Sequence, residues 1–396
     1  MRPTSVLATV TGRDRPGVTA AFFSALAAHD VDVLDVEQVV IRDRLILAVL
    51  LDLRGEPSAL RASVSKAAAA LGMECEVALA DPASDTARAG HSGRSHVIVI
   101  GRPLRPGTVS HITERIADLG ANIESVTQLS VLPASSLELM VRTDDQAELR
   151  AVLVQAAEDL GVDIAVEPAG LRRRATRLVV LDMDSTLIKD EGIDALGGSA
   201  GVGEQIATIT ERAMAGELDF EQSLRARVRL LAGMPVADVE TVRDHLELTP
   251  GARTFVRTLR RLGYHVGLVS GGFTVFTDRF VDELGLDFAA ANELQIRDGR
   301  LTGNVVGPII DRAGKAEALR RFAGQFGVPL SQTVAVGDGA NDIDMLDAAG
   351  LGIAFNGKAA LRAAADTSVN LPYLDTVLFV LGISRDDIAE ASIEGD

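Results

Sequence analysis

Cysteine is nearly absent from this sequence of 396 residues, in which Cys75 stands alone. No disulfide can therefore form within the chain, which favours a reducing compartment. The sequence also lacks any apolar run of the roughly 18 to 20 residues that a membrane-spanning helix needs. It does not begin with the basic start and apolar stretch of a signal peptide. We therefore expect a soluble, cytoplasmic protein without a membrane partner.

Positive charge is also scarce. The chain has 39 lysines and arginines against 56 aspartates and glutamates, a net charge of −17. Nucleic acid as a partner is not expected, because binding it requires a basic surface. The acidic balance suits a divalent cation. Any phosphate site, in contrast, must supply its own local positive charge.

The length of the chain predicts two or three domains. Two stretches have the composition of linkers: residues 81–95 (DPASDTARAGHSGRS) are small and polar, and residues 167–177 (EPAGLRRRATR) hold a proline, a glycine and a basic cluster. We predict domains at residues 1–84, 94–168 and 176–396.

The first two blocks repeat one pattern. Each has a β-like run, a turn that ends in glycine, a helical stretch, two strands, a second helix and a last strand. This order is typical of the ferredoxin-like fold. The turns are TGRDRPG, which ends at Gly17, and GRPLRPG, which ends at Gly107. A glycine there can let a ligand carboxylate approach the helix N-terminus, or it can simply complete a tight turn.

With its G-x-D-R-P-G turn at residues 12–17, the first block resembles an ACT domain. ACT domains sense small molecules and often bind amino acids between paired domains. The resemblance implies an effector site at Asp14, Gly17 and Gly107, and a homodimer. The second block has Pro-Leu at residues 103–104, near the place of Asp14, so its ability to bind a ligand stays open.

The third block opens with a motif that carries chemistry. Residues 178–181 (LVVL) form the short apolar run expected of a strand buried in a parallel sheet, and DMDSTL follows at residues 182–187. Two residues apart in extended chain, Asp182 and Asp184 can enter the crevice beyond the strand ends where ligands bind. Carboxylates so close repel unless a cation or a shared proton compensates.

Three more motifs follow in order. HVGLVSGG, residues 265–272, ends a strand with Ser270 and two glycines, whose hydroxyl and N–H groups can bind phosphoryl oxygens. Lys315 lies in a segment that becomes helical. GDGANDIDM, residues 337–345, places Asp338 and Asp342 between a strand and a helix. The four motifs together resemble those of the haloacid dehalogenase superfamily of phosphotransferases.

The chemistry of phosphoryl transfer predicts the catalytic roles. Asp182 is the expected nucleophile, which forms an aspartyl phosphate. Asp184 is expected to protonate the leaving alkoxide and then to deprotonate the water that cleaves the acyl phosphate. Lys315 and Ser270 are expected to steady the transferring oxygens.

Magnesium is the expected cofactor, bound by the carboxylates of Asp182 and Asp338, because Mg²⁺ shares its ligands with phosphate and needs few from the protein. The resemblance adds the backbone carbonyl of Asp184 as a ligand. Asn341 and Asp342 are expected to orient either Lys315 or the water shell of the metal.

A helical insertion at residues 193–248 predicts a cap that closes over the site. A substrate that is an amino acid needs an anion for its ammonium and a cation for its carboxylate. Glu191 and Arg227 have the charges for these tasks, and a guanidinium fork suits a carboxylate. Arg225 and Arg229 are neighbouring candidates for the same role.

The runs DMDSTLIKDEG, residues 182–192, and FEQSLRARV, residues 220–228, resemble the phosphoserine phosphatases. The resemblance implies hydrolysis of O-phospho-L-serine, the last step of L-serine biosynthesis, with L-serine as an effector. Met214 and Phe220 would then wall the pocket. The expected substrate contacts are Glu191, Arg227, Ser270, Gly271, Lys315, Asn341, Met214 and Phe220.

Together the resemblances imply an α/β protein with two ferredoxin-like (ACT) α+β domains, then a Rossmann-like haloacid dehalogenase core with a small helical cap. Three alternatives stay open from the residues. The enzyme could act on another small phosphomonoester, the chain could be an amino-acid sensor with a residual phosphatase domain, or its first half could be a scaffold without a ligand.

Overall fold

The computed structural model describes residues 4–80, 93–170 and 178–393, which form two compact units divided at residue 90. Most of the linker predicted at residues 81–95, the end of the one predicted at residues 167–177 and the domain limits at 84 and 176 lie outside the described residues. No helix in the described ranges is long and apolar enough to cross a membrane.

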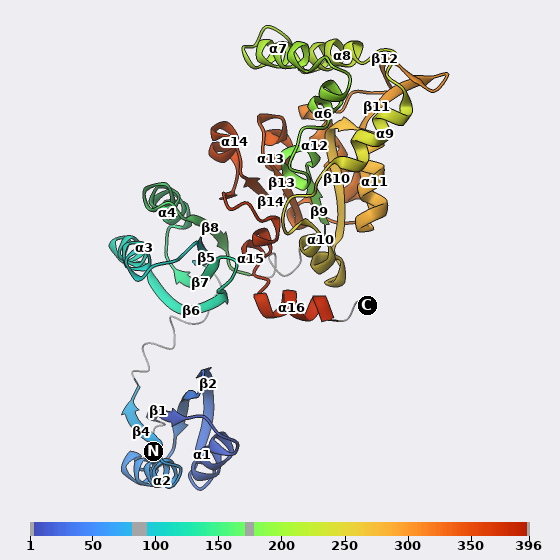
Figure 1. Ribbon diagram of the computed structural model, residues 1–396. Coiled ribbons are helices and arrows are strands. Elements are labelled where there is room, and N and C mark those ends of the chain that lie inside the picture. Colours follow the sequence, from blue (N-terminus) through green and yellow to red (C-terminus); the bar gives the residue numbers. More distant parts are fainter. Residues whose placement is uncertain (1–3, 81–92, 171–177, 394–396) are drawn as a thin grey trace. The chain divides into compact units, whose positions relative to one another are not determined.

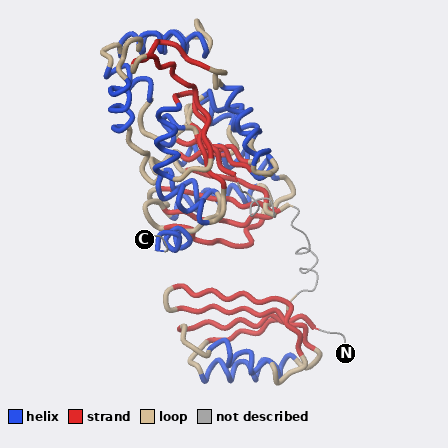
Figure 2. Tube along the Cα trace, turned by 90° about the vertical axis from the view of Figure 1, so that its right-hand side faces the viewer, coloured by secondary structure: helices blue, strands red, loops and turns tan. Residues whose placement is uncertain are grey.

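The first unit is a four-stranded antiparallel sheet with two helices on one face, as Figure 2 shows. Its strands run in the order β2-β3-β1-β4, which confirms the ferredoxin-like prediction. Alternate residues of the central strands are buried beneath the helices. The elements are β1 (Thr4–Arg13), α1 (Val18–Leu26), β2 (Val31–Ile41), β3 (Arg44–Leu53), α2 (Pro57–Ala70) and β4 (Glu74–Leu79).

One boundary in this unit differs from the prediction. We expected Gly12 in the turn before α1, but β1 continues to Arg13, which pairs with Arg44. The reason is packing, because a Cβ at Gly12 would lie 2.3 Å from the sulfur of Met73. The glycine therefore allows the end of the strand to approach that side chain.

The second unit begins with the same fold, in the sheet order β6-β7-β5-β8. The outer face of this sheet is covered: Ile98, Ile100 and Leu129 belong to the same buried cluster as the core of the C-terminal domain. The elements are β5 (Arg94–Gly101), α3 (Pro106–Asp118), β6 (Asn122–Ser130), β7 (Ser135–Arg142), α4 (Gln146–Leu160) and β8 (Asp163–Pro168).

The C-terminal domain contains a seven-stranded sheet in the order β12-β11-β10-β9-β13-β14-β15, parallel except for β12. The apolar run at residues 178–181 is the central strand β9, and it is wholly buried as predicted. The strands are β9 (Leu178–Leu181), β10 (His265–Phe273), β11 (Phe288–Arg297), β12 (Arg300–Val306), β13 (Thr333–Gly337), β14 (Leu351–Phe355) and β15 (Thr367–Val369).

Helices surround this sheet and extend beyond one end of it, where Figure 1 shows α7 and α8 at the top of the domain. The cap range contains α6 (Gly192–Ser199), α7 (Gly203–Met214), α8 (Phe220–Leu230) and α9 (Val236–His245). The others are α10 (Ala252–Arg261), α11 (Thr274–Leu284), α12 (Arg312–Gln325), α13 (Ile343–Ala348), α14 (Ala359–Ala364), α15 (Val377–Val380) and α16 (Arg385–Ile393).

The chain enters and leaves the cap through two adjacent segments, which we call the outgoing segment (residues 187–189) and the return segment (residues 246–249). The two pair in antiparallel fashion. The N–H of Lys189 donates to the carbonyl of Glu247 (3.0 Å), and the N–H of Thr249 donates to the carbonyl of Leu187 (2.8 Å). The cap is therefore attached through one short two-stranded ribbon.

Candidate active site

The site begins where β9 ends. Asp182 follows Leu181, and its N–H still donates to the carbonyl of Val336 on β13 (2.9 Å), so the residue stays in register with the sheet. Its side chain is 3% exposed, and Oδ1 accepts a hydrogen bond from the N–H of Met183 (2.7 Å). The chain then turns sharply through Ser185, which has a left-handed φ of 55°. The strand therefore delivers Asp182 to the crevice beyond its carboxyl end.

Asp184 lies beside the nucleophile candidate in a setting that favours a proton. Its Oδ1 accepts from the N–H of Gly192 (2.8 Å), and its Oδ2 accepts from the hydroxyl of Ser270 (3.4 Å). Burial, followed by the charge of Glu191, raises the pKa of Asp184 to about 7. A carboxyl group with this pKa can donate a proton near neutral pH and later take one back.

Lys315 supplies the local positive charge that the acidic chain needs. Its Nζ lies 2.7 Å from Oδ1 of Asp182 and 2.7 Å from Oδ1 of Asp342, and its side chain is 1% exposed. Burial lowers the pKa of Lys315, but the two ion pairs outweigh burial and raise it overall. The ammonium therefore stays charged, ready for the oxygens of a phosphoryl group.

Three buried carboxylates, of Asp182, Asp338 and Asp342, have ligand atoms within 4.8 Å of one another. Burial and the charge of Asp342 raise the pKa of Asp338 to about 6. Lys315 pairs with Asp182 and Asp342, and the exposed Lys358 lies 3.9 Å from Oδ2 of Asp338, so the three buried carboxylates share a single buried cation. Hard oxygen donors with uncompensated charge fit Mg²⁺.

The structure separates the two roles considered for Asp342. Its Oδ1 bonds to Lys315, and its Oδ2 accepts from the N–H of Gly339 (3.1 Å), so both oxygens have partners within the protein. Asn341 is half-buried and folds back on the same loop, where its Oδ1 lies 2.2 Å from a Cβ built at Gly339.

The last residues of β10, where its pairing with β11 is irregular between Val269 and Phe273, pack closely against these acids. Ser270 is fully buried, and its hydroxyl accepts from the N–H of Gly272 (2.8 Å). A Cβ at Gly272 would lie 2.8 Å from Oδ2 of Asp184, so only glycine fits there. Gly271 lies beneath the ring of Phe220 on α8, which is 3.1 Å from a Cβ built on it. The cap thus reaches the end of β10 through Phe220.

Sequence reasoning missed Asn292, which connects two motifs. This fully buried side chain on β11 donates to the carbonyl of Gly271 (2.8 Å) and accepts from the N–H of Ile310 (2.8 Å), just before α12 and Lys315. The available signal was a polar amide inside the apolar run FAAANELQI, where a buried strand position needs partners.

Two of the candidate substrate-binding residues, Glu191 and Arg227, lie at the start of the cap and on its helix α8. Glu191 lies at the N-terminal end of α6 and accepts from the hydroxyl of Ser185 (3.1 Å). Burial lowers the pKa of the half-buried Arg227, while the charges of Asp194, Glu191 and Asp184 oppose that change. Its Nε donates to the carbonyl of Ser223 one turn back on α8 (3.4 Å).

The other candidates in the cap lie away from these acids. Arg225 pairs with Glu221 on its own helix (2.7 Å), and Arg229 is exposed, which distinguishes Arg227 from both. Met214 is 76% exposed at the end of α7.

The expected effector residues lie in two different units. The N–H of Asp14 donates to the carbonyl of Asp43 (2.7 Å), and Gly17 precedes α1 with a φ of 92°. Gly107 lies in the first turn of α3. Open space surrounds both glycines, since no atom lies within 4 Å of a Cβ built at either.

Comparisons with known proteins agree with this geometry. Residues 176–350 match the haloacid dehalogenase-like hydrolase family, and residues 4–78 and 94–167 each match an ACT domain. A phosphoserine phosphatase of Streptomyces coelicolor is 52% identical and covers 99% of this chain and 95% of its own length. Phosphoserine phosphatase SerB2 of Mycobacterium tuberculosis is 52% identical over 99% of this chain and 96% of its own.

Among solved structures, the unliganded form of a probable phosphoserine phosphatase from Vibrio cholerae superposes with a TM-score of 0.59. It is 35% identical and covers 77% of this chain and 90% of its own.

Proposed function

Because the chain belongs to the phosphoserine phosphatases, with a haloacid dehalogenase-like hydrolase domain behind two ACT domains, we propose that Asp182 accepts the phosphoryl group of O-phospho-L-serine. The observation that carries this role is the buried contact between Asp182 and Lys315 at the carboxyl end of β9. A carboxylate held beside an ammonium can approach an anionic phosphate, which it would otherwise repel.

The proposed reaction has two steps. A carboxylate oxygen of Asp182 attacks phosphorus, the bond from phosphorus to the serine oxygen breaks, and the carboxyl of Asp184 gives its proton to the leaving alkoxide. Asp184 next takes a proton from water, whose oxygen attacks the phosphorus of the acyl phosphate. Inorganic phosphate leaves and the Asp182 carboxylate is restored.

The remaining residues bind and position the phosphate. Lys315, the hydroxyl of Ser270 and the N–H groups of its loop, Gly271 included, hold the transferring oxygens. Asp182, Asp338 and the backbone carbonyl of Asp184 would hold Mg²⁺, which supplies charge stabilisation to the phosphoryl group when it is bound.

The cap selects the amino acid. Glu191 would bind the substrate ammonium, Arg227 its carboxylate, and Phe220, Met214 and Asn341 would complete the pocket. The support for the first two is the charge of each side chain and its position toward Asp184.

The first half of the chain is proposed to regulate the second. L-serine is the proposed effector, with Asp14 and Gly17 as candidate contacts in the first unit and Gly107 as a candidate contact in the second, and titration calorimetry with L-serine tests its binding. A second copy of the chain is the proposed partner, supported by apolar side chains such as Leu34, Ile41 and Leu79 that the first unit leaves exposed. Light scattering in solution tests the homodimer.

The biological setting is part of the same proposal. Formation of L-serine from its phosphate ester would complete L-serine biosynthesis in the cytoplasm, where a lone cysteine stays reduced. Domain limits of 1–84, 94–168 and 176–396, with the cap at about 193–248, are proposed from the composition of the chain.

The decisive experiment measures phosphate release from L-phosphoserine with and without Mg²⁺, for wild type, Asp182→Asn and the exposed control Asp386→Asn. Asp182→Asn should fold, because burial already raises the pKa of that carboxyl. We expect activity to require Mg²⁺, to vanish in Asp182→Asn and to persist in the control. Strong activity in Asp182→Asn would overturn the mechanism.

A further inference from the structure

The helix α11 touches both ends of the cap insertion. Phe276 packs against the start of α6, where a Cβ at Gly192 would lie 2.7 Å from its ring. Arg279 contacts the last turn of α9 at the other end of the cap. Because these residues are three positions apart, they lie on one face of α11.

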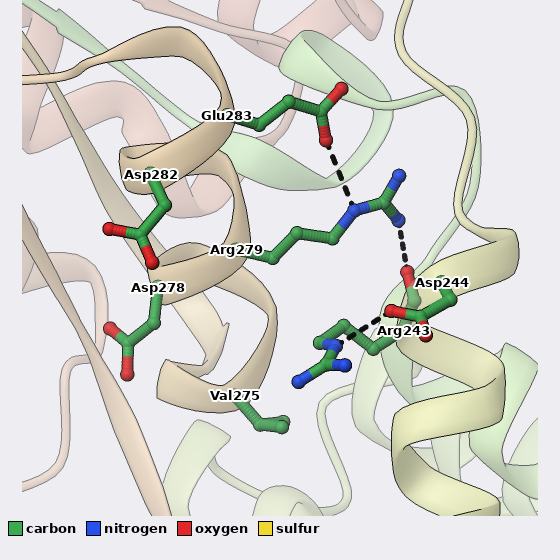
Figure 3. A pocket seen from close by; sticks show the side chains of 7 residues that line it. All are labelled: Arg243, Asp244, Val275, Asp278, Arg279, Asp282 and Glu283. Carbon is green, nitrogen blue, oxygen red and sulfur yellow. Dashed lines mark hydrogen bonds and ion pairs between the residues drawn. The ribbon is translucent and has the colours of Figure 1, made fainter.

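Figure 3 shows how Arg279 makes its contact. Its Nη1 donates to the carbonyl of Arg243 and to that of Leu246 (3.2 Å), and its Nε donates to the carboxylate of Glu283 one turn along α11 (3.1 Å). The Arg279 side chain is 23% exposed. The guanidinium thus binds at the carboxyl end of α9, where the carbonyl of Arg243 also accepts from the N–H of Leu246 (3.3 Å).

The charge of Arg279 suits this place. The carboxyl end of a helix carries partial negative charge, so a cation there is favourable. Glu283 orients the guanidinium on α11, and the planar guanidinium donates to the two carbonyls and the carboxylate from two separate nitrogens in fixed directions. Leu246, one of the two carbonyl partners, is the first residue of the return segment.

The position of α11 connects this contact with the reaction. The helix starts at Thr274, directly after β10, whose last four residues are Ser270, Gly271, Gly272 and Phe273. A displacement of the return segment would also disturb the outgoing segment, because the N–H of Lys189 bonds to the carbonyl of Glu247. The outgoing segment leads straight to Glu191.

We propose that α11 supports the cap hinge, formed by the outgoing and return segments, and that Arg279 is the positioning residue that anchors the return segment. This anchor would hold the cap so that Glu191 and Arg227 contact the amino-acid part of the substrate. This inference rests on the proposed function of the cap. It assigns no contact between Arg279 and substrate, so its effect must appear in selectivity for the amino acid rather than in phosphoryl transfer.

The test compares Arg279→Met and Arg279→Lys with a matched control, Arg253→Met. Arg253 pairs with the same carboxylate, Glu283, but is 63% exposed and lies on α10, which follows the return segment in sequence. Kinetics are measured with L-phosphoserine and with p-nitrophenyl phosphate, which lacks the amino and carboxylate groups. Hydrogen–deuterium exchange follows the amides of residues 186–190 and 246–250.

We expect Arg279→Met to raise KM for L-phosphoserine about tenfold, with less than about a twofold change in kcat/KM for p-nitrophenyl phosphate, in line with the loss of charge-assisted hydrogen bonds. Exchange at Lys189 and Thr249 should accelerate while α11 stays protected. Arg279→Lys should be intermediate, and Arg253→Met should match wild type.

Equal losses for both substrates, or equal effects of Arg253→Met, would show that Arg279 only stabilises the fold. If Arg279→Met does not fold, Arg279→Lys and Glu283→Gln decide the question by the same ratio of substrates. If wild type fails to hydrolyse L-phosphoserine, the proposed function is wrong, and hydrogen exchange still decides whether Arg279 anchors the hinge.

Discussion

Asp184 shows how burial can prepare a single side chain for two opposite tasks. The same environment that raises its pKa to about 7 suits the proposed mechanism, in which it gives a proton to the leaving group and later takes one from water. This preparation destabilises the protein when the carboxylate is charged. The pKa of Asp184 in the folded state exceeds its ordinary value of 3.8, so between these two pH values the folded chain binds a proton that the unfolded chain has lost.

Asp184→Asn therefore should lose activity and gain stability. Stability of the metal-free wild type falls as pH rises from about 4 to about 7, and the neutral amide removes this loss. We expect the melting temperature to rise by about 2–5 °C at pH 8 in EDTA and the gain to disappear near pH 4. Phosphate release should fall by about 10²- to 10⁴-fold.

The exposed neighbour Asp190 is the control for this prediction. Asp190→Asn changes the same charge outside the buried group, so its melting temperature and activity should follow wild type at both pH values. If Asp184→Asn melts at a lower temperature than wild type at pH 8, the charged Asp184 carboxylate does not destabilise the folded protein.

At the scale of elements, the sequence predicted what local patterns encode. The sequence alone predicted three features, because apolar runs and turn residues indicate local structure. They are the buried strand at residues 178–181, the repeated βαββαβ order and the order of the four motifs. The hydrogen bonds of Asn292 and of Arg279 could not be predicted from the sequence, since each connects segments that are brought together only in the folded protein. The extension of β1 through Gly12 likewise depends on Met73.

Asn292→Asp tests how one strand holds two motifs. The introduced carboxylate can still accept from Ile310 but repels the carbonyl of Gly271, which needs a donor. We expect kcat/KM at pH 8 to fall about 10- to 100-fold and inhibition by inorganic phosphate to weaken. Because a protonated carboxyl can donate again, activity relative to wild type should recover as pH falls toward 6.

The exposed Asn304 on β12 supplies the matched change of amide to carboxylate. Asn304→Asp should leave the pH profile and the affinity for phosphate unaltered. A pH profile of the Asn292 variant that runs parallel to wild type would sink the idea that the bond to Gly271 matters.

At the scale of the molecule, the second ACT domain is part of the unit that contains the active site. Asp163 at the start of β8 accepts from the N–H (2.9 Å) and the side-chain amide (2.7 Å) of Asn370, and burial raises its pKa. Beside them, Arg150 donates to the carbonyl of Asp366 (2.6 Å). These polar bonds border the apolar contact made by the outer face of the sheet.

Asp163→Ala should loosen this contact. Loss of the carboxylate leaves two donors of Asn370 without their partner, at a cost of about 1–3 kcal/mol, so the melting temperature should fall by about 2–6 °C. Differential scanning calorimetry provides the measurement, with Asp159→Ala on the exposed side of α4 as control. An unchanged melting temperature would mean that solvent replaces Asp163 without loss.

The paired outgoing and return segments have a consequence for how this enzyme could diversify. The chain leaves the core and re-enters it at adjacent points. The length of the insertion between these points can therefore change without moving the core residues on either side. Domains are most readily inserted or exchanged at sites of this kind. Evolution or an engineer could therefore replace the cap, and with it the choice of substrate, while the Asp182 strand and its chemistry remain as they are.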